Sequence, residues 1–297
     1  MLRDGAWPGG VGERKCGEGR PSAVPAAPAG DAQALARRAR SGQHGAVKLL
    51  EPVAPLIDLI YPPRCPLCGE GLAAQGGLCA ACWQELAIPG EPACALCQRP
   101  FGDTMPEGTV CAPCLAEPPR HDGIAAGTLY NDASRRLVLA FKHGRRIALA
   151  PLLARLVAAR LPPHVVEHGD EWLAVPVPLH RRRLWRRGFN QSALLAREIA
   201  RLSDAEVLVD GLVRRKATPV LGGLGRKARA RALSGAIAVN SRRADQLRGG
   251  KILLVDDVMT SGATSAACVF ALKRAGAEKV VVACFARVLE EALEHAA

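Results

Sequence analysis

Two adjacent carboxylates followed by a hydroxyl-rich turn are the residues of this sequence best suited to bind a small polar ligand. Asp256 and Asp257 can accept hydrogen bonds from a vicinal diol or approach a divalent metal ion. The turn after them supplies three hydroxyl groups and a glycine: Thr260, Ser261, Gly262 and Thr264. A turn that opens a helix also presents free N–H groups to an anion. A diol site beside a phosphate site predicts a ribose 5-phosphate as the ligand.

The surrounding elements indicate how this stretch is positioned. Lys251–Asp256 has the apolar pattern of a buried strand, Ala263–Arg274 that of a helix, and Lys279–Phe285 that of another strand. This order predicts parallel strands with right-handed crossovers, in which ligands bind at the carboxyl ends of the strands. Upstream we expect strands at Ile124–Tyr130 and Trp172–Pro178 and helices at Ala133–His143, Ile147–Leu161 and Asn190–Leu202. The expected fold class is therefore α/β with a parallel sheet.

Five arginines follow directly on the predicted strand that ends at Pro178: Arg181, Arg182, Arg183, Arg186 and Arg187. We expect them in a loop, where some form a solvated face and others bind an anion. Trp185 lies among them, and a core or surface position is favoured over stacking on a nucleic-acid base. Asn190 either caps the following helix or contacts the ligand.

Eight of the eleven cysteines form four Cys-x-x-Cys pairs: Cys65/Cys68, Cys79/Cys82, Cys94/Cys97 and Cys111/Cys114. Two such pairs complete a tetrahedral zinc site with four thiolate ligands. We expect at least one structural Zn²⁺ and favour two, with the pairs used in sequential order; a cross-braced order stays open. A disulfide framework is disfavoured because the sequence shows no export signal. Cys16, Cys268 and Cys284 are expected in the tail and the core.

Charge and composition divide the chain into three parts. Residues 1–45 are rich in Gly, Pro, Ala and Arg, and we expect a disordered or non-native N-terminal extension. Residues 46–119 hold three Lys/Arg against eight Asp/Glu and are expected to form a helix followed by the cysteine module. Residues 120–297 hold thirty Lys/Arg against sixteen Asp/Glu and form the predicted α/β domain.

Composition also restricts the function. Aromatic residues make up only 4% of the 297, which argues against a stacking-rich RNA or carbohydrate binder. The formal net charge of +12 favours an acidic partner, such as a phosphate compound or nucleic acid. No uncharged apolar run reaches 18 residues, so membrane insertion is not expected. The first 30 residues lack the apolar core of a signal peptide, which predicts a cytoplasmic protein.

The stretch KILLVDDVMTSGATSA resembles the 5-phosphoribosyl 1-pyrophosphate (PRPP) motif of type I phosphoribosyltransferases. The matching positions are Asp256, Asp257, Thr260, Gly262 and Thr264. The resemblance implies that Asp256 and Asp257 hold the ribose as the catalytic pair, that the next residues bind the 5-phosphate, and that Mg²⁺ accompanies PRPP. The implied PRPP site also includes Val258, Met259, Ser261 and Ala263. An ordinary βα turn and the magnesium-binding acidic pair of a receiver domain are the weaker interpretations.

The cysteine pairs together with Arg-Arg-Gly-Phe-Asn-Gln-Ser, which ends at Ser192, resemble the ComF family over about Val47 to Arg287. That family joins a double zinc ribbon to a phosphoribosyltransferase domain and is linked to DNA uptake. The resemblance implies that the arginine segment and Asn190 contact pyrophosphate, or DNA. It also implies that Arg214–Arg231 is a hood loop that closes over PRPP. Thr218 and Arg229 match that loop, whereas Leu221 and Ala232 replace the usual Gln and Asn.

Two functions follow from these expectations. In the first, a ComF-like protein binds PRPP or a related sugar phosphate, its basic loops contact single-stranded DNA, and it works with DNA-uptake proteins. In the alternative, an active phosphoribosyltransferase transfers the phosphoribosyl group to a base or an amine in nucleotide metabolism.

Overall fold

The computed structural model describes residues 61–102, 105–142, 146–216 and 235–289. The predicted N-terminal extension and the helix before the cysteine module lie outside these residues. So do Cys16, Thr218 and Arg229. None of the helices within the described ranges combines the length and the apolar character that a membrane span requires.

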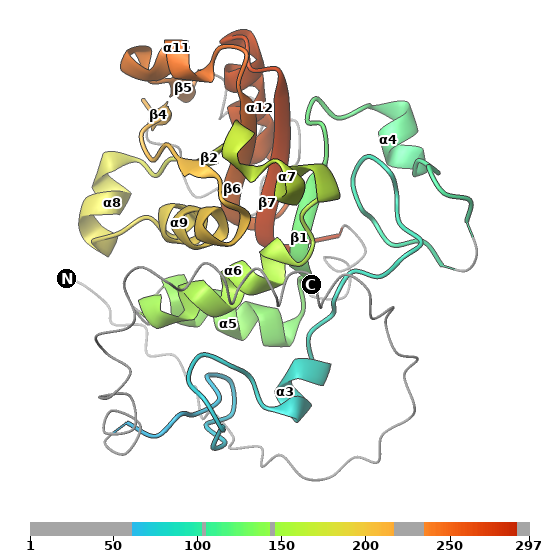
Figure 1. Cartoon of the computed structure of the whole chain (residues 1–297), viewed down its shortest axis with the longest axis vertical. Coiled ribbons are helices and arrows are strands. Elements are labelled where there is room, and N and C mark those ends of the chain that lie inside the picture. The colour runs from blue at the N-terminus through green and yellow to red at the C-terminus, as the bar shows by residue number, and fades with distance from the viewer. Residues whose placement is uncertain (1–60, 103–104, 143–145, 217–234, 290–297) are drawn as a thin grey trace, which may run out of the picture.

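A five-stranded parallel sheet forms the centre of the molecule, with the strand order β1-β7-β6-β2-β3 (Figure 1). Its strands are β1 (Ile124–Leu129), β2 (Trp172–Pro176), β3 (Glu206–Val207), β6 (Lys251–Met259) and β7 (Lys279–Arg287). Every neighbouring pair in it is parallel, as the alternation of strand and helix patterns predicted. The carboxyl ends of the strands therefore meet at one edge of the sheet.

Helices cover both faces of this sheet. On one face lie α5 (Asp132–Lys142), η1 (Ile147–Leu149), α6 (Ala150–Ala158) and α9 (Gln191–Ser203), which bury a core with Trp172, Leu253 and Phe285. On the other face α12 (Ala263–Arg274) covers a second core that includes Ile252 and Val282. Before β2 come α7 (Pro163–Glu167), which packs against α9, and η2 (Gly169–Glu171). Buried Cys268 and Cys284 lie in the second core, which confirms their predicted core position.

Two elements beside the site differ from the prediction: the strand β6 is longer than expected, and the arginine segment is a helix. β6 continues to Met259, three residues past the expected end, because Val258 and Met259 keep pairing with β7. The arginine segment, expected as a loop, forms the helix α8 (Arg181–Arg187). The His180 side chain accepts a hydrogen bond from the Arg182 N–H at its start, and Gly188, at φ +83°, ends it. The loop prediction was therefore wrong.

A small antiparallel pair, β4 (Leu212–Arg214) and β5 (Ile237–Val239), flanks the segment predicted as a hood loop. Residues 217–234 of that segment lie outside the described residues. After β5 come η3 (Ser241–Arg243) and α11 (Ala244–Leu247), and β5 packs against α12. The pair thus lies on the α12 face of the molecule.

The cysteine-rich segment, with α3 (Ala80–Gln84) and α4 (Ala112–Ala116), precedes β1 and contacts the sheet domain. Ala87 forms a β-bridge with Leu129, and its carbonyl accepts a hydrogen bond of 2.9 Å from the Thr128 hydroxyl. Glu85 pairs with Arg136 of α5 at 2.7 Å. These contacts fix the segment beside the amino-terminal half of the domain.

Candidate functional site

Asp256 and Asp257 lie near the carboxyl end of β6, where a parallel sheet binds its ligands. Asp256 is buried, and its Oδ1 accepts hydrogen bonds from the Ser192 hydroxyl (3.2 Å) and the Asp257 N–H (2.9 Å). Burial, together with the neighbouring Asp257 charge, raises the pKa of Asp256 to about 7. Asp257 is half-buried and is the more accessible of the two carboxylates.

Lys142, the last residue of α5, lies 3.0 Å from Asp257, measured from Nζ to Oδ2. The Gln191 side chain donates to the Lys142 carbonyl at 3.4 Å and fixes the end of the helix beside the site. Sequence reasoning missed Lys142, Gln191 and Ser192 as site residues. No local sequence pattern marked Lys142, because its place depends on where α5 ends relative to β6.

The turn after β6 has the geometry that an anion site requires. Gly262 caps α12 at φ +71°, a conformation that favours glycine, and a Cβ there would also displace the end of the Met259 side chain, 3.0 Å away. Thr260 is exposed, and Ser261, Ala263 and Thr264 are half-exposed. Among the described residues, the three hydroxyl groups of this turn make no hydrogen bond. They are therefore available to a ligand.

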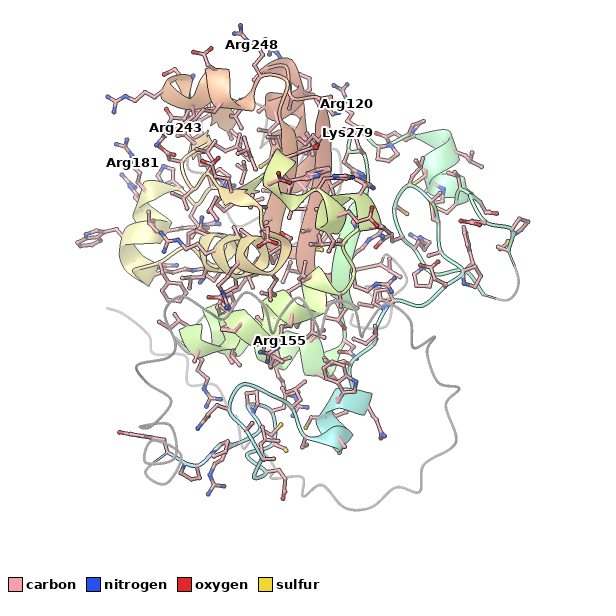
Figure 2. The ribbon with its side chains drawn as sticks, in the orientation of Figure 1. Arg120, Arg155, Arg181, Arg243, Arg248 and Lys279 are labelled. Atoms are coloured by element: carbon pink, nitrogen blue, oxygen red, sulfur yellow. The ribbon has the colours of Figure 1, made fainter. Side chains whose placement is uncertain are left out.

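Helix α8 divides the five predicted arginines into two groups. Arg187 is half-buried and donates to the Gln191 Oε1 at 3.2 Å. Burial lowers the pKa of Arg187, and the Asp257 charge opposes this. Arg183 is also half-buried. The remaining three, Arg181, Arg182 and Arg186, are exposed, and Figure 2 shows Arg181 projecting from α8.

Asn190 is the N-cap of α9. Its Oδ1 accepts from the Ser192 N–H at 3.1 Å, and its Nδ2 donates to the Val177 carbonyl at 3.1 Å. This confirms the N-cap interpretation. The residue ties the segment after β2 to the start of α9 and so holds Ser192 next to Asp256.

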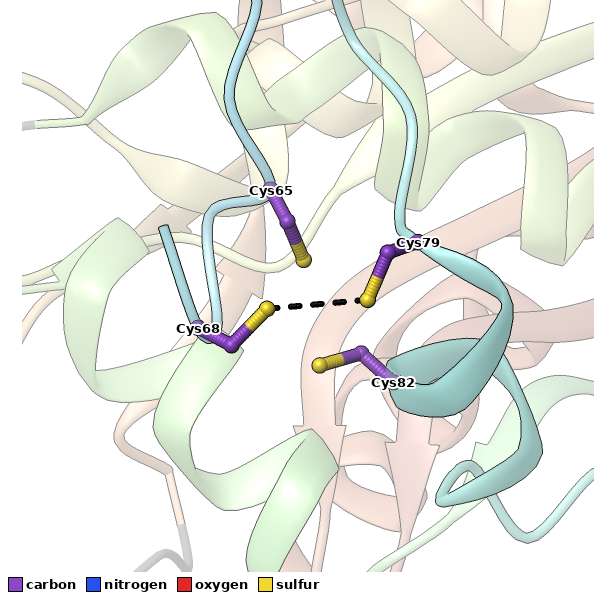
Figure 3. A group of neighbouring side chains, drawn as sticks. All are labelled: Cys65, Cys68, Cys79 and Cys82. Carbon is purple, nitrogen blue, oxygen red and sulfur yellow. Dashed lines mark hydrogen bonds between the residues drawn. The ribbon is translucent and has the colours of Figure 1, made fainter. Parts of the chain in front are cut away.

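The four cysteine pairs form two four-cysteine clusters, each built from sequential pairs. The first cluster joins Cys65, Cys68, Cys79 and Cys82 (Figure 3), and the second joins Cys94, Cys97, Cys111 and Cys114. In each, the four Sγ atoms lie within 4.8 Å of one another. The sulfurs of Cys68 and Cys79 are 3.5 Å apart and those of Cys97 and Cys111 are 3.6 Å apart. A tetrahedral Zn²⁺ with Zn–S bonds of about 2.3 Å separates its sulfurs by about 3.8 Å, so both clusters fit the ion.

The two clusters use the same turn despite different sequences. The Gly69 N–H donates to the Cys65 carbonyl at 2.8 Å, and the Gln98 N–H donates to the Cys94 carbonyl at 2.8 Å. Both turn residues have positive φ, +79° for Gly69 and +52° for Gln98. Where the first cluster has a glycine, the second therefore has a glutamine in the left-handed conformation.

Hydrogen bonds from backbone N–H groups favour the thiolate form of one cysteine in each cluster. Burial opposes the charged form of both, but N–H groups around each sulfur lower the pKa of Cys65 to about 7 and that of Cys94 to about 6. The Cys111 N–H, for example, lies 3.3 Å from the Cys94 Sγ. Zinc is bound by thiolates, so these donors favour metal binding.

Comparison with known families agrees with both parts of this architecture. Residues 56–115 match the model of a double zinc ribbon domain, and residues 187–297 match that of a phosphoribosyl transferase domain. The chain is 30% identical over 244 residues to the DNA utilization protein YhgH of Escherichia coli (strain K12), covering 78% of this chain and all of that protein. The chain belongs to the ComF family. Competence protein F of Haemophilus influenzae is 30% identical over 222 residues, which cover 74% of this chain and 94% of that protein.

Membership of the ComF family assigns the two four-cysteine clusters as the metal sites of the double zinc ribbon. All four ligands of each cluster come from cysteine, which leaves no open coordination position, so the role of the zinc is structural. It also places the acidic pair of β6 and the turn after it within the phosphoribosyl transferase domain.

Proposed function

We propose that this ComF protein binds PRPP at the carboxyl end of β6. The observation that carries the proposal is the acidic pair Asp256–Asp257, placed directly before a glycine-capped turn whose three hydroxyl groups have no other partner among the described residues. Carboxylates accept hydrogen bonds from the ribose diol. The turn and the start of α12, a helix of 12 residues, receive the 5-phosphate.

The cationic groups around the pair suit the diphosphate of PRPP. Arg187 and Lys142 both lie near Asp257, so the site holds positive charge on the side of α8 and α5. A guanidinium donates to phosphate oxygens in a fixed geometry. Mg²⁺ supplies charge neutralisation of the diphosphate when bound, and Asp257 is the accessible carboxylate that would hold it.

A link to DNA handling is the second part of the proposal. It is supported by the names of the relatives, DNA utilization protein and Competence protein F, and by the exposed surface of α8. That surface combines the three exposed arginines with Trp185, of which 91% is exposed. Arginines beside an aromatic ring suit single-stranded DNA, because bases stack on the ring while the cations contact phosphates. We propose that α8 contacts single-stranded DNA.

Transfer of the phosphoribosyl group to a base or amine is the alternative function. The family match of residues 187–297 to a phosphoribosyl transferase domain favours it. Under this alternative Asp256 and Asp257 hold the ribose while the diphosphate leaves, and the cations stabilise the leaving group. The released diphosphate is the product to measure.

Calorimetric titration of PRPP with Mg²⁺ into the zinc-loaded chain tests the proposal. Asp257→Asn should abolish the binding heat, whereas Asp245→Asn, which alters an exposed carboxylate of α11, should leave it unchanged. No binding by the wild type, or equal binding by Asp257→Asn, would contradict the proposed site. Diphosphate release on addition of free bases or amines distinguishes turnover from binding alone.

A further inference from the structure

A cavity of about 820 Å³ lies on the outer side of α12, apart from the acidic pair. Helix α12 buries Cys268, Val269 and Leu272 against the sheet. Its opposite side forms one wall of the cavity, and β5 forms another. The apolar lining includes Phe270 and Ala271 of α12 together with Ile237 and Val239 of β5. The volume falls in the range of about 300–1,000 Å³ that is typical of small-molecule sites.

Two arginines meet at an aromatic ring in this cavity. Arg120, from the segment before β1, and Arg274, at the end of α12, place their guanidinium carbons 5.0 Å and 5.6 Å from the centre of the Phe270 ring. Phe270 thus holds both cations at one place in the lining. Figure 2 shows Arg120 near the end of the sheet at which β7 begins.

These cations lack anionic partners within the part of the chain that the structure describes, where neither Arg120 nor Arg274 forms an ion pair. Glu117 also lines the cavity, so the charged groups around it carry a net positive charge. Two guanidinium groups offer several N–H donors to a carboxylate, sulfonate or phosphate. The remaining lining offers an apolar surface to the rest of a ligand.

The cavity shares Ser261, Gly262 and Ala263 with the proposed PRPP site and differs from it in its other residues. Asp256, Asp257 and Lys142 do not line it. It touches Ser261 and Gly262, so it reaches the turn after β6 from the side of α12. Arg274 and Phe270 lie toward the other end of α12 from that turn, so a ligand bound to the two arginines lies apart from the place of the ribose.

We propose that this cavity is a second ligand site, which binds an organic anion with a flat apolar body. The anionic group binds Arg120 and Arg274, and the apolar body packs on Ile237 and Val239. If instead the two arginines only cover Phe270 and interact with the end of α12, the cavity binds no anion.

The test uses 8-anilinonaphthalene-1-sulfonate, an aromatic anion whose fluorescence rises in apolar sites, titrated into the full zinc-loaded chain. We expect one equivalent to bind. The double variant Arg120→Gln/Arg274→Gln should weaken binding at least tenfold. Arg242→Gln/Arg248→Gln, which removes two exposed arginines outside the cavity, should change it less than twofold.

The double variant could lose binding because it fails to fold, so a second variant changes the charge of the cavity at a different residue. Ala266 is exposed and lines the cavity, so Ala266→Glu adds a negative charge there without disturbing the core. It should weaken the binding of the sulfonate, and Asp257→Asn should not. Unchanged binding in both cavity variants, or an equal loss in the control pair, would overturn the proposal. Asp257→Asn removes a carboxylate of the proposed PRPP site and leaves Arg120 and Arg274 in place, so a failure of PRPP binding is distinguished from a failure of sulfonate binding.

Discussion

The Lys142 ammonium lies 3.0 Å from the Asp257 carboxylate and joins the end of α5 to the end of β6. The pair is partly shielded, with 23% and 13% of the two side chains exposed. It neutralises one charge of the acidic pair, and so it limits the repulsion between Asp256 and Asp257. A diol or metal ion that binds Asp257 must compete with Lys142.

The energy of this contact can be measured by a double-mutant cycle. Lys142→Met, Asp257→Asn and their combination should give a coupling energy of about 1–3 kcal/mol in the free energy of unfolding, because a shielded pair is weakly screened. The exposed pair Arg248–Asp245, 3.9 Å apart, is the matched control and should show no measurable coupling. Equal coupling in the two cycles would show that shielding does not strengthen the Lys142 contact.

We expect a substitution of Gly262 to weaken PRPP binding as well as to lower the stability of the fold. Gly262→Ala and Gly249→Ala both place a side chain at positive φ, +71° and +69°, and each should lower stability by about 1 kcal/mol. Only the residue at 262 lies in the PRPP turn, and only its Cβ meets another atom within 4 Å. Calorimetry should therefore show PRPP binding weakened at least tenfold in Gly262→Ala and unchanged in Gly249→Ala. The same affinity in both variants would contradict the assignment of the turn.

The pH dependence of stability reports the burial of Asp256. Its pKa is raised from 3.8 in the unfolded chain to about 7 in the folded protein, so the folded state binds more protons between these values. The contribution of Asp256 to stability is then fully present below pH 4, declines as the pH rises from about 4, and is lost as the pH passes 7. Asp256→Asn retains an oxygen acceptor but cannot ionise. Urea unfolding between pH 5.5 and 8 should show a decline in the wild type that is smaller in Asp256→Asn, and parallel curves would refute the assignment.

Zinc content tests the two four-cysteine clusters separately. The wild type should contain two zinc ions per chain by elemental mass spectrometry. Cys82→Ala and Cys114→Ala should each contain one, because each removes one ligand from a different cluster. Cys268→Ala removes a buried thiol that belongs to neither cluster, and it should retain both ions. Loss of both ions in either ligand variant would show that the clusters are not independent.

The surface of α8 predicts a salt-dependent interaction with DNA. Neutralising the three exposed arginines with glutamine should weaken binding to oligothymidylate and reduce the salt slope of log K by about 2, since each phosphate contact on a single strand contributes about 0.7. Trp185→Ala should weaken binding at fixed salt without changing the slope, because stacking releases no counterions. Fluorescence anisotropy of labelled oligothymidylate measures both the affinity and its dependence on salt. The same three replacements at Arg201, Arg242 and Arg248, also exposed, are the control and should have a smaller effect.

The buried strands were predictable because their pattern is local. The apolar run before Asp256 marked β6, and the glycine and hydroxyl residues marked the turn and the start of α12 at Ala263. The end of β6 was not predictable, because pairing with β7 carries the strand on to Met259. The sequence favoured sequential pairing of the cysteines but left a cross-braced order open, and the structure confirms the sequential order.

Other parts of the site depend on contacts between distant segments. Helix α8 has no apolar face that its sequence would reveal, and the signal that was present lay in His180 and Gly188 at its two ends. Lys142 reaches Asp257 only because α5 ends beside β6, and no local pattern shows this. Ser192 is likewise placed by the Asn190 cap.

A crystal structure of the zinc-loaded chain with PRPP and Mg²⁺ tests the central claim most directly. We expect density for the ribose hydroxyl groups at Asp256 and Asp257, and for the 5-phosphate within hydrogen-bonding distance of Thr260 and Thr264. We also expect that Lys142 has moved away from Asp257. PRPP bound elsewhere on the molecule, or no PRPP in the site at saturating concentration, would contradict the claim.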